Sequence, residues 1–172
     1  AEILNGKVNP SGSLADTYCF DNYSSPVMQN FTPIVYEGDV SQIPAHADTY
    51  MVYQEGIYVG YKYYETRYED YVMGTGKAGD YAYGDDVAFP FGYGLSYTSF
   101  EYSDMKLAYD AESTTYTIDV TVTNTGKVAG KETVQIYVSS PYTDYDKENK
   151  VEKASVSLVG FDKTDILEPG AS

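Results

Sequence analysis

Phe89-Pro90-Phe91-Gly92-Tyr93-Gly94-Leu95-Ser96-Tyr97-Thr98 is too irregular a segment for an ordinary helix or strand, because it combines four aromatic residues with a proline and two glycines. Pro90 fixes its own φ and restricts Phe89, whereas Gly92 and Gly94 can adopt backbone conformations that other residues avoid. The composition therefore predicts a tailored turn whose rings are aimed at defined neighbours. We expect Phe91 to be buried and the turn to join the regions on either side of it.

Downstream of this turn, the sequence has the alternation of β-strands. Apolar residues occupy every second position from Tyr116 to Val122, with threonine and aspartate between them, which is the pattern of a strand with one buried face. Asn124-Thr125-Gly126 ends this run. Further strands are expected over residues 100–107, 133–138 and 155–159. Four strands predict the opening of an immunoglobulin-like β-sandwich, which uses about seven, so we expect this domain to be C-terminally truncated.

Upstream of the turn, the first 97 residues follow neither the helical nor the strand period and are interrupted by prolines and glycines. No helix of ordinary length is predicted there. Residues 53–64 fit a strand or a helix equally, because their aromatic residues match neither period.

Composition places the chain among globular proteins and narrows its partners. It is 42% hydrophobic and 22% charged, with a formal net charge of −15. This charge opposes binding to nucleic acid or to an anionic membrane surface, both of which require lysine and arginine. The 21 tyrosines and absent tryptophan suit contact with neutral sugars, although packing within β-sheets explains most of them equally well. Cys19, as the single cysteine, excludes an internal disulfide, and the compartment is not assigned.

Several segments, taken in order, resemble glycoside hydrolase family 3, the β-glucosidases and β-xylosidases. The turn over 89–98 resembles the signature that precedes the fibronectin type III-like domain of these enzymes. The other matching segments are Ile3-Leu4-Asn5-Gly6 with Asn9-Pro10-Ser11-Gly12-Ser13-Leu14, Glu55-Gly56-Ile57-Tyr58-Val59-Gly60-Tyr61-Lys62-Tyr63-Tyr64, Val120-Thr121-Val122-Thr123-Asn124-Thr125-Gly126, Gly160-Phe161-Asp162-Lys163 and Leu167-Glu168-Pro169-Gly170.

The resemblance implies a mainly β chain with two parts. Residues 1–97 correspond to the terminal part of the family's α/β sandwich domain, with residues 66–87 as a Tyr/Gly-rich insertion loop. Residues 98–172 correspond to a fibronectin type III-like β-sandwich, truncated at its C-terminus. The implied parent is a retaining β-glucosidase that hydrolyses terminal non-reducing β-linked sugars. The partners of this chain would then be the TIM-barrel and sandwich segments of the parent and its oligosaccharide or glycoside substrate.

Retaining hydrolysis needs two carboxylates about 5 Å apart, one as nucleophile and one as acid/base. The resemblance places both outside this chain, so no catalytic residue is assigned and the isolated chain is predicted to be inactive. Glu55 is expected to be a structural partner of backbone amides. The remaining acidic residues of this region are expected to be solvated loop charges, namely Glu65, Glu69, Asp70, Asp85 and Asp86.

Two motifs suggest a cofactor or a metal, and neither is accepted. Residues 74–79 match the glycine pattern of a dinucleotide site, but no hydrophobic strand precedes them and the following segment carries three negative charges that would repel pyrophosphate. Residues 144–149 begin like a calcium-binding loop, but the sixth position is Asn149 and the twelfth is Ser155. A flexible loop and a hydrated hairpin tip are the preferred interpretations, and no cofactor or metal is expected.

Two isolated residues complete the candidates. His46 has no recognisable nucleophile partner, so a catalytic triad is not expected. Cys19 is interpreted as a small, half-buried apolar residue.

Two alternatives to the family 3 interpretation stay open. In the first, the chain is a non-catalytic carbohydrate-binding or adhesion module whose exposed tyrosines stack on sugar rings. In the second, it is a purely structural linker domain. Retention on immobilised cello-oligosaccharides would favour the first alternative, and its absence the second.

Overall fold

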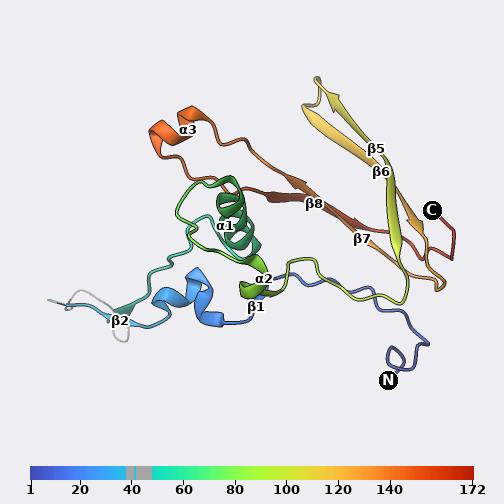
Figure 1. The fold of residues 1–172 in the computed structure, drawn as a ribbon, viewed down its shortest axis with the longest axis horizontal. Coiled ribbons are helices and arrows are strands. Elements are labelled where there is room, and N and C mark those ends of the chain that lie inside the picture. Colours follow the sequence, from blue (N-terminus) through green and yellow to red (C-terminus); the bar gives the residue numbers. More distant parts are fainter. Residues whose placement is uncertain (38–40, 42–47) are drawn as a thin grey trace. The chain divides into compact units, whose positions relative to one another are not determined.

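The computed structural model describes residues 1–37, 41 and 48–172 (Figure 1). They divide into two compact units, the first formed by residues 1–14, 92–136 and 158–172 and the second by residues 15–91 and 137–157. Strands contribute more residues than helices, and the sheets are small. The predicted mainly β class is thereby confirmed.

The first unit contains a long β-hairpin. Strand β5 (Phe100–Asp110) pairs antiparallel with β6 (Thr115–Asn124), as Figure 1 shows. The pairing begins at Phe100 opposite Asn124 and shifts register after Ser103. Asp104, within the shift, has a φ of +53°, which is the left-handed conformation found in β-bulges. The strands predicted from the alternating pattern are therefore present, and β5 extends three residues beyond the predicted end.

A second two-stranded sheet pairs β7 (Thr133–Val138) with β8 (Ser157–Lys163). Strand β7 has the predicted bounds. Strand β8 begins two residues later than predicted and continues to Lys163, because Gly160 does not interrupt the extended backbone.

Asn124, at the end of β6, is fully buried and holds three segments of the first unit together. Its side-chain amide donates hydrogen bonds to the Val128 carbonyl at 2.9 Å and the Leu167 carbonyl at 2.8 Å. Its side-chain oxygen accepts from the Thr98 hydroxyl at 2.6 Å and the Gly126 amide at 3.0 Å. Every hydrogen-bonding position of this buried amide is thus occupied, as burial of a polar group requires.

The beginning of the first unit lies against the end of the Phe89–Thr98 turn. The Leu14 amide donates a hydrogen bond to the Tyr93 carbonyl at 2.8 Å, and the Leu14 carbonyl accepts one from the Gly92 amide at 2.8 Å. Gly92 has a φ of +80°, as its position in the turn predicts. Gly94 is needed for another reason, since a Cβ there would lie 2.6 Å from the Gly12 carbonyl oxygen.

The second unit holds several short elements. Strands β1 (Tyr18–Cys19) and β4 (Val87–Phe89) pair antiparallel, as do β2 (Ile34–Val35) and β3 (Thr49–Tyr50). Two 3₁₀ helices, η1 (Asn22–Ser24) and η2 (Pro26–Asn30), lie between β1 and β2.

Helix α1 (Tyr61–Met73) shows that the predicted absence of an ordinary helix is wrong. It begins after Gly60, which offers no side-chain cap, and its tyrosines and charges give no clear apolar stripe, so the usual start signals are missing. Its end is conventional. Gly74 has a φ of +66°, and its amide bonds to the Asp70 and Tyr71 carbonyls, which is the usual glycine termination of a helix.

The core of the second unit forms around this helix. Tyr64 is its one buried residue within α1, and Ala78, Tyr81 and Val87 are buried with less than a tenth of their surface exposed. Phe91 is only half-buried and packs its ring 4.8 Å from that of Tyr61. The expectation that Phe91 is buried is therefore met only in part.

Two further helices replace predicted loops. Helix α2 (Tyr83–Asp86) lies within the expected insertion loop, residues 66–87. The C-terminal part of α1 also belongs to this range. Helix α3 (Asp144–Asn149) occupies the expected hairpin tip. Thr143 and Asp146 form a reciprocal capping box at its start, and this local pattern explains why the segment is helical.

Candidate functional site: a tyrosine-lined pocket

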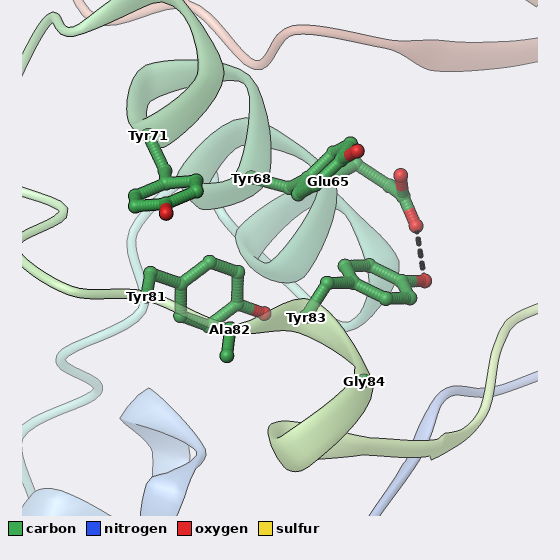
Figure 2. A pocket seen from close by; sticks show the side chains of 7 residues that line it. All are labelled: Glu65, Tyr68, Tyr71, Tyr81, Ala82, Tyr83 and Gly84. Atoms are coloured by element: carbon green, nitrogen blue, oxygen red, sulfur yellow. Dashed lines mark hydrogen bonds between the residues drawn. The ribbon is translucent and has the colours of Figure 1, made fainter.

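Within the second unit, α1 and the segment that leads into α2 enclose a pocket of about 610 Å³, which we call the tyrosine pocket. Figure 2 shows its lining, which is predominantly aromatic with one carboxylate. The lining residues are Glu65, Tyr68, Tyr71, Tyr81, Ala82, Tyr83 and Gly84.

Two different periodicities bring these side chains together. Glu65, Tyr68 and Tyr71 are spaced three residues apart on α1, so they share one face of the helix. Tyr81 and Tyr83 are two residues apart at the entry to α2, where Ala82 has an extended backbone. The Tyr68 and Tyr83 rings meet edge to face with centroids 5.5 Å apart, an arrangement that aromatic pairs prefer.

Glu65 and Tyr83 form the polar end of the pocket. The Tyr83 hydroxyl donates a hydrogen bond to the Glu65 carboxylate at 2.6 Å (Figure 2). Burial, followed by the Glu65 hydrogen bond and charge, raises the pKa of Tyr83, so its phenol stays protonated as a donor at neutral pH. Glu65 was expected to be a solvated loop charge. It is instead a half-buried helical residue with a defined partner.

Tyr81 is a buried ring of the pocket lining. It is 5% exposed, and the Arg67 guanidinium lies 4.8 Å from the centroid of its ring. Burial is the main cause that raises the pKa of Tyr81, and the Asp86 charge adds to it. Its hydroxyl is buried and has no hydrogen-bond partner within the part of the chain that the structure describes.

Among the described residues, Glu65 is the one carboxylate that lines the pocket, whereas retaining glycoside hydrolysis needs a pair. The chemistry of the pocket is that of recognition, with aromatic faces and a few hydrogen-bonding groups. No sequence motif identifies it. The three-residue spacing from Glu65 to Tyr71 is the one signal that would have pointed to a shared helical face.

The other acidic candidates do not gather into a second site. Glu69 is exposed on α1, and Asp70 accepts a hydrogen bond from the Thr75 hydroxyl at 3.0 Å. Asp85 and Asp86 lie in the first turn of α2, where negative charge is favourable. These residues are helical rather than loop charges. Glu55 is half-buried, and its role as a partner of backbone amides stays a prediction.

Residues 74–79 follow the C-terminal end of α1 and lie beside the Asp70 carboxylate. A dinucleotide loop instead presents phosphate to the N-terminal end of a helix. The helix end found here carries a partial negative charge. The arrangement agrees with the interpretation of residues 74–79 as a loop.

Asp146 is buried and its Oδ2 already has three partners within the chain, which argues against the calcium-loop interpretation. Its carboxylate accepts hydrogen bonds from the Thr143 amide and hydroxyl at 2.7 Å each and forms an ion pair with Lys153 at 2.7 Å. The Lys153 hydrogen bond is the largest cause that lowers the pKa of Asp146 to about 2, and the Thr143 bonds add to it.

The remaining candidates add no site. Cys19 is a free, half-buried thiol, as expected. His46 lies outside the described residues. Among the described residues, no cluster of three or more histidine, cysteine, aspartate or glutamate side chains is placed to hold a metal ion. Within the same part of the chain, none of the helices combines the length and apolarity needed to cross a bilayer.

The whole chain is similar to one portion of several β-glucosidases. Thermostable beta-glucosidase B of Acetivibrio thermocellus is 36% identical over 172 residues, which cover 99% of this chain and 18% of that protein. Beta-glucosidase A of Butyrivibrio fibrisolvens is 36% identical over 185 residues, covering 100% of this chain and 18% of that protein. No protein-family model matches the chain.

Solved structures agree with these relatives. The GH3 β-glucosidase of Bifidobacterium adolescentis has a TM-score of 0.70 and 31% identity, covering 99% of this chain and 20% of that one. The chain is a homologue of one segment of the glycoside hydrolase family 3 β-glucosidases. β-Glucosidase 3B of Thermotoga neapolitana, solved with α-D-glucose, matches this family 3 segment with a TM-score of 0.69 and 36% identity, covering 98% of this chain and 19% of that one. The family 3 segment thus spans about a fifth of the length of these relatives.

Proposed function

We propose that this chain is a structural, non-catalytic segment of a retaining β-glucosidase that hydrolyses terminal non-reducing β-linked sugars. The observation that carries the proposal is the match of the entire chain, at 36% identity, to about a fifth of named β-glucosidases. Retaining hydrolysis requires a carboxylate pair, and the family resemblance assigns both members to segments other than this one. The partners that we propose are the TIM-barrel and sandwich segments of the parent and its glycoside substrate, without nucleic acid or membrane.

Within that parent, we propose that residues 1–97 end the α/β sandwich domain and that residues 98–172 begin the fibronectin type III-like domain. Residues 66–87 are then an insertion into the first of these, and they include the end of α1 and helix α2. The hairpin of β5 and β6 and the sheet of β7 and β8 support the second assignment, because a β-sandwich is built by stacking such paired strands.

The similarity of this segment to its relatives does not identify the sugar specificity of the parent. An exo-α-(1→6)-L-arabinopyranosidase of Bifidobacterium breve is also 36% identical over 172 residues, covering 100% of this chain and 18% of that protein. Proteins named for different sugars therefore have equally similar segments here. We propose β-glucoside as the substrate because that name recurs among the relatives.

The test compares the 172-residue chain with the full-length protein that contains it, using an aryl β-glucoside as substrate. We expect hydrolysis by the full-length protein with retention of configuration, and none by the chain alone. Hydrolysis by the chain that is abolished by Glu55→Gln or Glu65→Gln would place the catalytic centre within residues 1–172 and refute the proposal.

A further inference from the structure

We propose that the tyrosine pocket is a binding site for a neutral sugar. This inference goes beyond the proposed function, because it assigns a binding role to residues 65–84 whether or not the protein hydrolyses glycosides. It depends on three properties of the pocket, which are the accessibility of its rings, the free acceptors at its polar end and the distribution of charge around it.

Two of the lining rings are partly exposed in the 172-residue chain. Tyr68 is 46% exposed and Tyr71 is 49% exposed. Figure 2 shows these two side chains projecting from α1 on one side of the pocket, with Tyr81 and Tyr83 on the other. A pyranose has apolar C–H faces that pack on such flat rings and hydroxyl groups at its edges, so its two kinds of surface match an amphipathic aromatic lining.

The polar end of the pocket has hydrogen-bonding capacity that a sugar can use. An ionised carboxylate accepts at about four lone-pair positions, and the hydrogen bond from Tyr83 takes one of those on Glu65. The Tyr83 oxygen can also accept a bond while it donates to Glu65. A purely apolar ligand would strip water from Glu65 without replacing its hydrogen bonds, which is unfavourable. Ligand hydroxyls would replace them.

Charge excludes the remaining ligand classes. An anion would be repelled by Glu65 and by the net charge of −15. A cation would find rings and a carboxylate, as in an aromatic cage, but the Arg67 guanidinium already lies 4.8 Å from the Tyr81 ring and would repel it. A neutral, hydroxyl-rich ligand meets neither objection. The pocket volume of about 610 Å³ falls within the range of small-molecule sites, roughly 300–1,000 Å³.

The test uses the full-length protein and a sulfur-linked cellobiose, which glycosidases do not cleave, in calorimetric titrations of the wild type and of matched variants. Tyr71→Ala removes a half-exposed ring, so we expect the melting temperature to stay close to that of the wild type and the affinity to fall about 5- to 10-fold. Tyr71→Phe keeps the ring and should stay within about 2-fold of the wild type. Glu65→Gln keeps the shape and should weaken binding about 3- to 10-fold by removing a charged acceptor.

Tyr145→Ala is the matched control, because Tyr145 is 69% exposed and lies on α3, outside the pocket lining. It should bind the probe like the wild type. Any hydrolytic centre elsewhere in the protein would bind the probe as a second site, so each titration is fitted to two sites and only the site whose affinity changes in the variants is compared. Equal affinities for the wild type, Tyr71→Ala and Glu65→Gln would overturn the inference. Tighter binding of tetramethylammonium than of the sugar probe, lost in Tyr71→Ala, would overturn it in favour of a cation site.

The two proposals fail separately. If the protein hydrolyses an aryl β-glucoside but Tyr71→Ala and Glu65→Gln bind the probe like the wild type, the proposed function is supported and the sugar pocket is refuted. Probe binding that depends on Tyr71 in a protein without glycosidase activity would do the reverse.

Discussion

Replacing Asn124 with alanine should strongly destabilise the first unit. The side chain makes four hydrogen bonds, two as donor and two as acceptor, and is 0% exposed. At a net contribution of roughly 0.5–1.5 kcal/mol per hydrogen bond, their loss amounts to about 4 kcal/mol. A water molecule that enters the vacated space can satisfy some of the partners, which lowers the expected loss to about 3 kcal/mol.

Urea and thermal unfolding of the full-length protein, followed by circular dichroism, would measure this effect. A loss of about 3 kcal/mol corresponds to a fall in melting temperature of roughly 12–24 °C for a unit of about 60–100 residues, the size range of the first unit. Asn124→Asp should be at least as harmful, because it keeps the size of the side chain but turns both donors into acceptors that face the Val128 and Leu167 carbonyls. The Thr98 hydroxyl and the Gly126 amide would still donate to one carboxylate oxygen. The other oxygen would face two carbonyls and no donor, which is strongly unfavourable for a buried charge.

Asn149→Ala is the matched control for this experiment. Asn149 is exposed on α3, and its amide makes one hydrogen bond, to the Tyr145 carbonyl at 2.9 Å. A change within about 0.5 kcal/mol is expected for such a surface substitution. If Asn124→Ala lost less than about 1 kcal/mol, or no more than Asn149→Ala, the argument that Asn124 holds three segments together would be refuted.

Three further predictions concern single positions. Phe91→Ala should cost about 2 kcal/mol, less than the roughly 3–5 kcal/mol of a fully buried ring, because Phe91 is half-buried; an unchanged melting temperature would show that the ring does not stabilise the turn. Gly94→Ala should destabilise by about 1–3 kcal/mol because its Cβ would lie 2.6 Å from a backbone carbonyl oxygen, whereas Gly12→Ala, with no atom within 4 Å of its Cβ, should be neutral; equal effects would contradict the close approach. The pKa of Asp146 is lowered to about 2, so its ion pair with Lys153 stabilises the fold above about pH 4 and this contribution is lost as the pH falls toward 2. The melting-temperature difference between the wild type and Asp146→Asn should therefore shrink over that interval, and a constant difference would contradict the linkage.

The strands of the first unit could be predicted because their signal is local. Alternation of apolar and polar residues from Tyr116 to Val122 is set by the pleat of a strand and survives whatever packs against it. The bulge after Ser103 could not be predicted in this way. Asp104 has a left-handed conformation, but the sequence has no glycine or asparagine at that position, and those are the residues that usually indicate one. The register of β5 on β6 depends on that bulge, so it too had to come from the structure.

Helix α1 and the tyrosine pocket could not be predicted because tyrosine gives an ambiguous signal. It favours strands by propensity, it is amphipathic, and ten of the thirteen residues of α1 are tyrosine or charged. No apolar stripe is visible in such a segment. What fixes the helix is tertiary, since Tyr64 is buried in the core of the unit and Gly74 closes the C-terminal end. Glu65 therefore looked like a loop charge although it faces Tyr83.

Apart from residues 55–64, which lie in the second unit, the segments that carried the family resemblance contact one another. Asn9, from the first motif, accepts a hydrogen bond from the Tyr97 amide at 2.8 Å in the turn and donates one to the Ala129 carbonyl at 3.0 Å. Gly12 lies against Gly94 in the same turn.

The last motif joins this network at Asn124, whose backbone carbonyl accepts from the Gly170 amide at 2.8 Å. Some of these motif residues are polar because buried backbone groups of the first unit need hydrogen-bond partners. Others are small because two backbone segments lie close together there. The residues that identify the family are therefore residues that hold the fold of the first unit together. This explains why the sequence revealed the family without revealing a site, since the tyrosine pocket lies in the other unit and outside every one of these contacts.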